Sequence, residues 1–132
     1  MKAHGRAWTV AKRETDAGLS VLRLMTLEAS FPFNRYPERL NIIWPFQQEA
    51  LNGTPAPKEL DAMGRFEKRI CKQIEKAGHA VLCMVFTEPG YREYVFLSRD
   101  VESFLSALSD IPQESAPYPI EIHHEMDSAT RF

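Results

Sequence analysis

The first third of the chain carries short segments rich in strand-forming residues. Arg6–Lys12 and Leu19–Met25 contain Val, Leu, Thr and Trp, and the Asp and Gly of the segment between them, Arg13–Gly18, suit a tight turn. This pattern predicts a β-hairpin. An aromatic loop with two prolines follows at Glu28–Pro37, and strand character returns at Leu40–Trp44.

The clearest helical pattern in the chain runs from Lys58 to Lys76. Pro57 suits the first turn of a helix because its missing N–H would have no partner there, and Gly78 suits the end. Between them, apolar residues recur at three- and four-residue spacing, at Met63, Phe66, Ile70, Ile74 and Ala77. We therefore expect one long amphipathic helix here.

The second half of the chain repeats the alternation of strands and helix. His79–Phe86 is nearly continuous in apolar residues and, after a Pro-Gly turn, Tyr91–Leu97 resumes strand character. Asp100 is a suitable N-cap for a helix over Val101–Ser109. A last strand is expected at Tyr118–Ile122, with Tyr118, Ile120 and Ile122 on one side and Glu121 and His123 on the other.

The expected order of elements is β-β-β-α-β-β-α-β, which predicts the α+β class. The last six elements follow the split β-α-β pattern of a ferredoxin-like two-layer sandwich, in which two helices cover one face of an antiparallel sheet. We expect a single domain over 1–132, with an N-terminal hairpin (1–27), a ferredoxin-like core (38–124) and a tail (125–132). The first hairpin is expected to extend the sheet or to cover one of its edges.

Composition supports a globular protein and adds an asymmetry of charge. The net charge of −2 disfavours a strongly basic nucleic-acid-binding protein. Residues 1–76 hold thirteen Lys and Arg against nine Asp and Glu, a balance of +4, whereas residues 77–132 hold three against nine, a balance of −6. Such a division can mark an interaction surface.

Signals for export or for membrane insertion are absent from the sequence. The N-terminus has no apolar segment suited to a signal peptide, and nowhere does an uncharged apolar stretch approach the ~20 residues of a membrane-spanning helix. Two cysteines in such a chain, Cys71 and Cys83, are expected to be reduced. We expect a cytoplasmic protein with no membrane association.

Several segments resemble a bacterial family catalogued as domain of unknown function 695. They are Ala7-Trp8, Arg35-Tyr-Pro-Glu-Arg-Leu40, Pro55-Ala-Pro-Lys-Glu-Leu60 and Thr87-Glu-Pro-Gly-Tyr-Arg-Glu-Tyr-Val-Phe96. Members often end in an Asp-Pro-x-Trp element, of which this chain keeps only Asp127. The family is similar to, and sometimes fused to, regulator B of ribonuclease E, a small inhibitory binding protein. The resemblance implies an α+β domain with a regulatory or binding role and supplies no catalytic residues.

Motifs of the common enzyme classes are absent from the sequence. It contains no phosphate loop, dinucleotide-binding glycine motif, nucleophile elbow, paired CxxC or HExxH helix. The nearest group to a metal site is His123, His124, Glu125 and Asp127, but adjacent strand residues point to opposite faces, so we favour exposed polar residues and no metal. Cys71 and Cys83 are best interpreted as buried or half-buried structural thiols.

Two surfaces are candidates for binding. The long helix gathers basic residues opposite its apolar stripe, at Arg65, Arg69, Lys72 and Lys76, either as a solvated face or as a docking surface for an acidic protein segment or RNA. In the segment Thr87–Phe96, Arg92 with Tyr91 and Tyr94 forms either a recognition edge for an anion or planar group, or ordinary cross-strand packing.

Three functional hypotheses remain open. The first is a non-enzymatic binding or regulatory module acting on a protein or ribonucleoprotein partner, without cofactor or catalytic residues. The second is a small-molecule-binding protein or enzyme, with a pocket formed by Trp8, Phe33, Trp44 and Tyr94 and with Arg92 holding an anionic ligand. The third is a homodimer formed through an exposed strand edge. A deep pocket containing Arg92 would favour the second hypothesis, and a filled core would favour the first.

Overall fold

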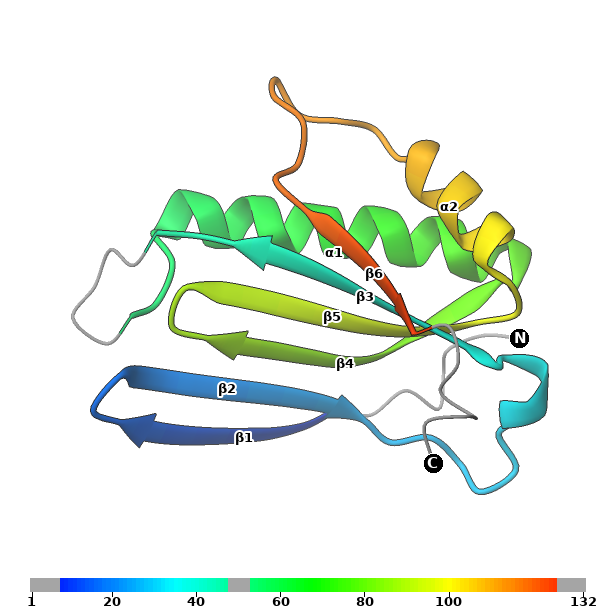
Figure 1. Cartoon of the computed structure of the whole chain (residues 1–132), viewed down its shortest axis with the longest axis horizontal. Helices are drawn as coiled ribbons and strands as arrows, with labels where there is room; N and C mark the ends of the chain where they lie inside the picture. The colour runs from blue at the N-terminus through cyan, green and yellow to red at the C-terminus, as the bar shows by residue number, and fades with distance from the viewer. Residues whose placement is uncertain (1–7, 48–52, 126–132) are drawn as a thin grey trace.

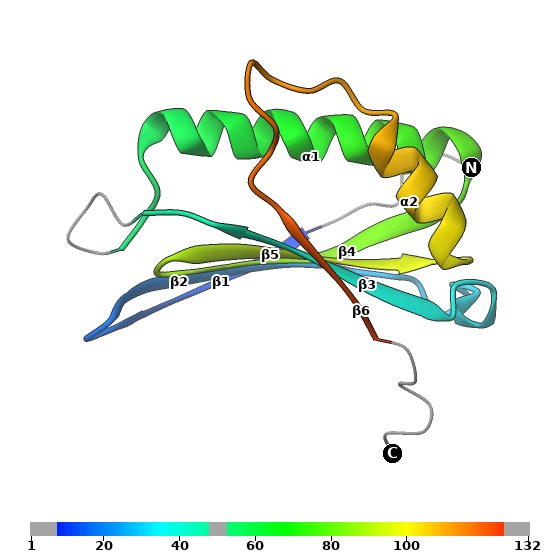
Figure 2. The same cartoon turned by 45° about the horizontal axis from the view of Figure 1, so that its top comes forward.

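The structure, a computed structural model, describes residues 8–47 and 53–125. It is an α+β fold in which a six-stranded antiparallel sheet carries two helices on one face (Figures 1 and 2). Across the sheet the strands are ordered β1-β2-β4-β5-β3-β6. The elements are β1 (Trp8–Thr15), β2 (Gly18–Met25), a short 3-10 helix η1 (Phe33–Arg35), β3 (Glu38–Pro45), α1 (Pro57–Ala77), β4 (Ala80–Glu88), β5 (Tyr91–Ser98), α2 (Val101–Ser109) and β6 (Glu121–Glu125).

Both predicted helices are present, and local sequence explains where they begin and end. Pro57 occupies the first turn of α1, and Gly78 ends it in a left-handed conformation (φ 68°) that a side chain would disfavour. Asp100 caps α2 by accepting a hydrogen bond from the Ser103 backbone N–H at 2.6 Å. These interactions confirm the sequence-based boundaries to within one residue for α1 and in full for α2.

The hydrophobic core lies between the helices and strands β3, β4 and β5. Its centre is Phe66 of α1, whose ring contacts those of Trp44, Tyr94 and Tyr118 at centroid distances of 5.8, 5.3 and 5.1 Å. The four buried residues of α1 are Met63, Phe66, Ile70 and Ile74. The spacing that predicted the helix is therefore also the spacing that fills the core.

The first hairpin has longer strands and a shorter turn than the sequence predicted. β1 continues to Thr15, which pairs with Gly18, so the turn consists of residues 16 and 17 alone. The Thr15 side chain accepts a hydrogen bond from the Ala17 N–H and donates one to the Gly18 carbonyl. These bonds close the turn and allow polar residues 13–15 to pair as strand.

The last strand begins three residues later than predicted, at Glu121. Pro119 has no N–H to offer a neighbouring strand, and Tyr118 instead turns into the core, where its side chain is buried. Ile122, which the sequence placed beside Tyr118 on one face, pairs with Ile42 and stays 42% exposed. The prediction of a strand over Tyr118–Ile122 was therefore wrong in its first half.

No helix in the described part of the chain is long and apolar enough to cross a membrane.

Candidate functional site

The predicted basic face of α1 is divided by the structure into two parts. Arg65 and Arg69 both bind Glu114, at 3.1 and 2.7 Å, and Arg69 also donates to the Tyr118 hydroxyl at 2.5 Å. Lys72 and Lys76 are exposed, and neither pairs with a carboxylate among the described residues. The two arginines thus hold the loop after α2 against α1, and the two lysines remain available to a partner.

The Glu114 carboxylate is stabilised in its charged form by this cluster. Hydrogen bonds from Arg65 and from the Tyr118 hydroxyl, together with the positive charge of both arginines, lower the pKa of Glu114 to about 2. The same contact raises the pKa of Arg65. Charge neutralisation within the cluster reduces the number of basic side chains that α1 offers to an acidic ligand.

We expect acid to release the loop over residues 112–118. The pKa of Glu114 is about 2 in the folded protein and 4.5 at its ordinary value, so the stabilisation is complete above pH 4.5 and is lost as the pH falls toward 2. The Tyr118 N–H, which donates to Gln113 Oε1, should lose its protection from hydrogen exchange over this range, measured as the exchange rate relative to the intrinsic rate at each pH. Glu114→Gln should lower this protection factor already at pH 6, and a protection factor that stays unchanged between pH 5 and 2 in the parent protein would contradict the prediction.

The predicted pair Arg92 and Tyr94 lies together, with Arg92 beside the Tyr94 hydroxyl, but the two residues differ in burial. Tyr94 is fully buried, its hydroxyl donates to the Met63 carbonyl at 3.4 Å, and desolvation raises its pKa to about 12. Its ring is therefore a core element and cannot contact a partner at the surface. Arg92 is half-buried, and its Nε donates to the Thr87 hydroxyl at 2.8 Å.

The aromatic residues predicted to form a pocket are not brought together. Trp44 and Tyr94 fill the core, whereas Phe33 is 53% exposed in η1, where its ring contacts that of Phe31 at 4.8 Å. Trp8 lies at the start of β1 and packs beside Arg23. An open hollow of about 510 Å³ is lined by none of these, nor by Arg92, but by Pro45, Phe46, Gln47, Ala56, Glu59 and Pro119.

The remaining predicted polar and thiol sites are accounted for by local contacts. His124 contacts Glu38 at 2.7 Å and His123 contacts Glu121 at 3.5 Å, and because the strand continues through both histidines they point to opposite faces. The described residues contain no group of three side chains suited to a metal, and Asp127 lies outside them. The Cys83 thiol donates to the Val95 carbonyl at 3.4 Å, and burial raises its pKa. Cys71 packs against the core.

The register of the sheet places Arg92 in a row of residues that reaches the first hairpin. In this row Lys12 lies opposite Val21, Val21 opposite Thr87, Thr87 opposite Arg92, and Arg92 opposite Trp44. Residues opposite one another share a face of the sheet, and Trp44 packs against α1. Lys12 and Arg92 therefore lie on the helix-bearing face.

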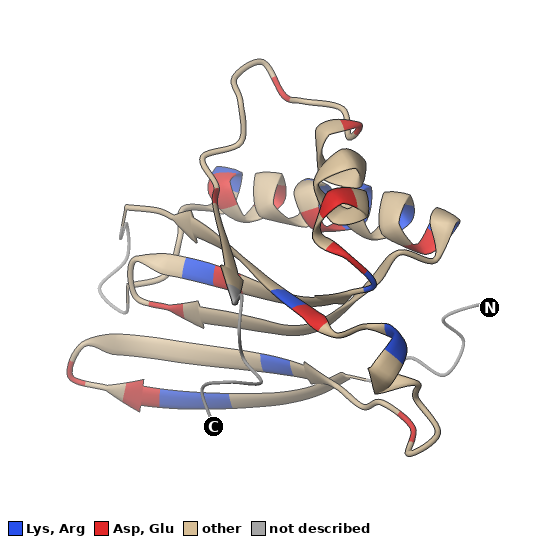
Figure 3. Cartoon of the chain, turned by 45° about the vertical axis from the view of Figure 1, so that its right-hand side comes forward, with Lys and Arg blue, Asp and Glu red and all other residues tan. Residues whose placement is uncertain are grey.

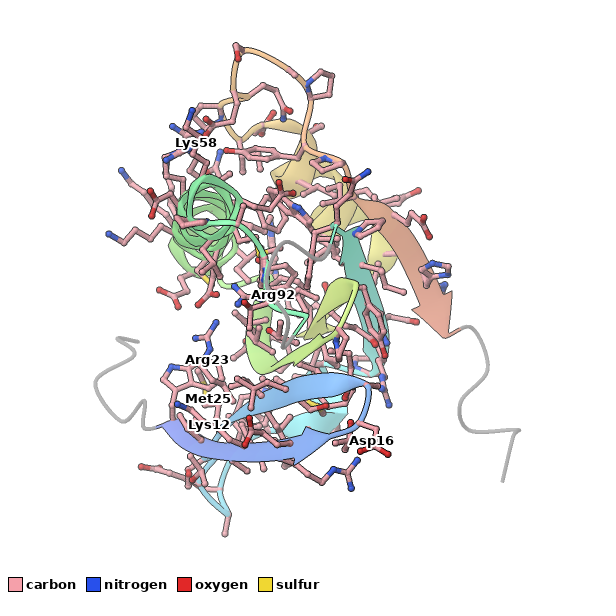
Figure 4. All side chains as sticks on the ribbon, turned by 90° about the vertical axis from the view of Figure 1, so that its left-hand side faces the viewer. Lys12, Asp16, Arg23, Met25, Lys58 and Arg92 are labelled. Atoms are coloured by element: carbon pink, nitrogen blue, oxygen red, sulfur yellow. The ribbon has the colours of Figure 1, made fainter. Side chains whose placement is uncertain are left out.

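The neighbouring row adds an arginine that connects the hairpin to α1. Val10 lies opposite Arg23, and the strand register continues from Arg23 across β4 to Tyr94. Because Tyr94 lies on the helix-bearing face, Val10 and Arg23 lie on that face as well. The Arg23 guanidinium makes two hydrogen bonds to Glu67 of α1, at 2.5 and 3.2 Å, and lies 5.1 Å from the centroid of the Trp8 ring. Figure 4 shows Arg23 and Arg92 between α1 and the hairpin.

On this side of α1, one flank of the helix faces the hairpin. Residues 60, 64, 67 and 71 recur on that flank at helical spacing, and Glu67 is fixed there by Arg23. Leu60 is 40% exposed, and a Cβ added at Gly64 would meet no atom of the described residues within 4 Å. We call the surface formed by Val10, Lys12, Arg23, Leu60, Gly64 and Arg92 the α1–hairpin trough.

Gly64 gives a direct test of whether the trough wall is open. Gly64→Ala should raise the free energy of unfolding by about 0.5–1 kcal/mol, because alanine favours the helix and the added methyl group meets no neighbouring atom. Chemical denaturation would measure the change. Gly78→Ala is the matched comparison and should destabilise, since that glycine has φ 68°. Destabilisation by Gly64→Ala would show that the wall is occupied.

The sequence suggested Arg92 as a binding residue but not Lys12, Arg23 or Gly64. Alternation along Leu19–Met25 does place Arg23 on the same face as Met25, but only the pairing of β2 with β4 shows that this face is the one beside α1. Figure 3 shows basic residues on β1 and β2 and acidic residues on α2 and the loop after it. The separation of basic and acidic residues along the sequence thus corresponds in part to a separation between the first hairpin and the α2 region in the fold.

Comparison with known proteins gives one match. No curated protein and no solved structure matches the chain. The model of a family of unknown function, DUF695, matches residues 6–132, which confirms the resemblance seen in the sequence. The chain therefore belongs to the DUF695 family of unknown function.

Proposed function

We propose that this protein is a non-enzymatic binding module that recognises a protein partner through the α1–hairpin trough. The observation that carries the proposal is that β1 and β2 extend the sheet beyond the part covered by α1 and α2 (Figures 1 and 4). Val10, on the helix-bearing face of this extension, is 52% exposed. An apolar surface beside unpaired cations is typical of a binding interface.

The order of the other four strands supports a ferredoxin-like core beneath this extension. Along the chain these elements follow one another as β3-α1-β4-β5-α2-β6, whereas across the sheet the strands are ordered β4-β5-β3-β6. In the sheet, β5 therefore lies between β3 and β4. Each half is then a split β-α-β unit of the ferredoxin-like sandwich. On this interpretation the first hairpin is an addition to the β4 edge, and among the described residues no helix covers its helix-bearing face.

The outward side of α1 is a second candidate surface for the same function. Lys72 and Lys76 are exposed one turn apart, and their ammonium groups would attract an acidic segment in a salt-dependent way. Reversing Arg65 or Arg69 would release Glu114 and disturb the fold, so only the two lysines provide a clean test of this surface.

Affinity capture from native lysate at low and at high salt tests the proposed function. The full chain is compared with Val10→Asp, which alters the trough, and with Ala11→Asp, which alters the opposite face of the same strand. We expect the parent chain to capture a protein that no longer binds the Val10→Asp variant and still binds the Ala11→Asp variant. Equal retention by both variants would contradict binding through the trough, and the absence of any captured protein would contradict the binding function.

A third variant separates the two surfaces. If Lys72→Glu with Lys76→Glu abolishes capture and Val10→Asp does not, the binding function stands and its site is the outward side of α1. A small anion that raises the melting temperature in the parent protein but not in Arg92→Gln would instead favour the alternative function, a small-molecule-binding protein or enzyme in which Arg92 holds the ligand.

We also propose a cytoplasmic location. It is supported by the two cysteines, which do not form a disulfide with each other.

A further inference from the structure

We infer that the α1–hairpin trough seats one amphipathic α-helix of the partner, with its apolar stripe on Val10 and Leu60 and its carboxylates beside Lys12 and Arg92. The inference rests on the proposed binding function and specifies its ligand. It is supported by the width of the trough, by the open space beside Gly64, and by two cations, Lys12 and Arg92, that have no carboxylate partner among the described residues.

The width of the uncovered sheet matches a helix. Neighbouring strands lie about 4.8 Å apart, so β1 and β2 add roughly 10 Å of sheet beyond β4. Helices packed side by side on a sheet have axes about 8–10 Å apart. One further helix would therefore cover the hairpin and pack beside α1, as α1 itself covers the core strands (Figure 4).

The wall of the trough is shaped for close approach. Gly64 lies in the interior of α1, where glycine is unfavourable, and no heavy atom of the described residues lies within 4 Å of a Cβ added there. Leu60, one turn earlier on the same flank, is 40% exposed. A partner helix lying against this flank would use both features, since its backbone could approach Gly64 while its apolar side chains cover Leu60.

The charges facing the trough favour an acidic partner. Three cations, Lys12, Arg23 and Arg92, share its face with two carboxylates, Glu67 and Glu14. Arg23 neutralises Glu67, and Glu14 lies toward the turn of the hairpin. Lys12 and Arg92 have no carboxylate partner among the described residues, so carboxylates of the partner are expected beside this row.

A second copy of this chain fits the trough less well. In a second copy, the exposed helix that is long enough to fill the trough is α1. Its outward side carries Lys72 and Lys76, which would repel Lys12 and Arg92. The acidic α2 has nine residues and spans about 14 Å, whereas the eight residues of β1 extend over about 26 Å. The trough therefore fits a separate partner whose helix has about 18 residues.

A display selection tests the inference with a defined probe. A library of helical 18-residue peptides with randomised surface positions is selected against the immobilised full chain, and selected peptides are measured by fluorescence anisotropy. We expect enrichment of peptides with an apolar stripe and net negative charge. Their affinity should fall at least tenfold with Lys12→Glu, which reverses charge in the trough, and with Gly64→Trp, which fills it.

Arg13→Glu is the matched control, because Arg13 is the next residue of β1, is also exposed, and lies on the opposite face. It should leave the affinity unchanged. Equal effects of the Lys12 and Arg13 variants, or no enriched acidic helix, would overturn the inference. If the capture experiment still yields a protein whose binding is lost with Val10→Asp, the proposed binding function stands. Only the inference that the ligand is a helix is then wrong.

Light scattering tests whether a second copy of this chain, not a separate partner, occupies the trough. We expect the parent chain alone to keep one mass over a hundredfold range of concentration. Concentration-dependent assembly that Lys12→Glu abolishes and Arg13→Glu does not would show that a second copy occupies the trough, and would overturn the assignment to a separate partner.

Discussion

Phe66→Ala is expected to lower the free energy of unfolding by about 3–5 kcal/mol, the usual range for removing a fully buried aromatic ring. Phe66 contacts the rings of Trp44, Tyr94 and Tyr118, which come from three different parts of the chain. Its removal leaves a cavity where α1, the sheet and the loop before β6 meet. Urea denaturation followed by tryptophan fluorescence would measure the change.

Phe33→Ala is the matched control for this substitution. Phe33 is 53% exposed and contacts one ring, that of Phe31. Removing it should change the stability by less than about 1 kcal/mol. A loss at Phe33 as large as that at Phe66 would show that the aromatic loop before β3 belongs to the core.

Arg23→Met is expected to lower the free energy of unfolding by about 1–2 kcal/mol. The change removes two hydrogen bonds between charged groups and leaves the Glu67 carboxylate, whose side chain is 21% exposed, without its partner. It also removes the guanidinium from the Trp8 ring. Because β1 and β2 join α1 through this contact, amide exchange of β1 and β2 should accelerate more than that of β3 and β5.

A double-mutant cycle isolates the interaction between these two side chains. Glu67→Gln alone should destabilise, and the pair Arg23→Met with Glu67→Gln should destabilise by less than the two single changes together. Additive effects would mean that Arg23 acts through its packing against Trp8, not through the carboxylate. Lys12→Met, which removes a cation with no carboxylate partner among the described residues, should leave stability nearly unchanged.

The first hairpin combines a largely exposed strand, β1, with the surface that supports the proposed function. Seven of the eight residues of β1 are exposed, and Arg23 fixes the hairpin relative to α1. A partner helix seated in the trough would contact both sides of this connection. Its binding should protect β1 and β2 from exchange, which links the stability of the hairpin to occupancy of the site.

The sequence predicted the elements with strong local patterns. Pro57, Gly78 and Asp100 act on their own neighbours, so the limits of both helices could be inferred without tertiary contacts. The four buried residues of α1 follow from spacing alone. The family was also evident, because its motifs are local, and its model covers residues 6–132.

Tertiary structure decided what local patterns do not contain. Tyr118 left the predicted last strand because the core beside Phe66 and the Arg69 guanidinium offered it better contacts than a strand interrupted by Pro119. Arg65 and Arg69 looked like part of a binding face until the fold brought Glu114, about 45 residues away, beside them. In the same way Tyr94 became a core residue because its face of β5 lies under α1.

The candidate site depends on tertiary structure most of all. The amino-acid sequence predicts a hairpin, a basic amphipathic helix and Arg92 as a binding residue. The pairing of β2 with β4 places Lys12, Arg23 and Arg92 on one face beside α1. Strand alternation leaves two faces equivalent, and only the register of a sheet chooses between them. That choice, made by contacts between residues sixty or more positions apart, forms the α1–hairpin trough.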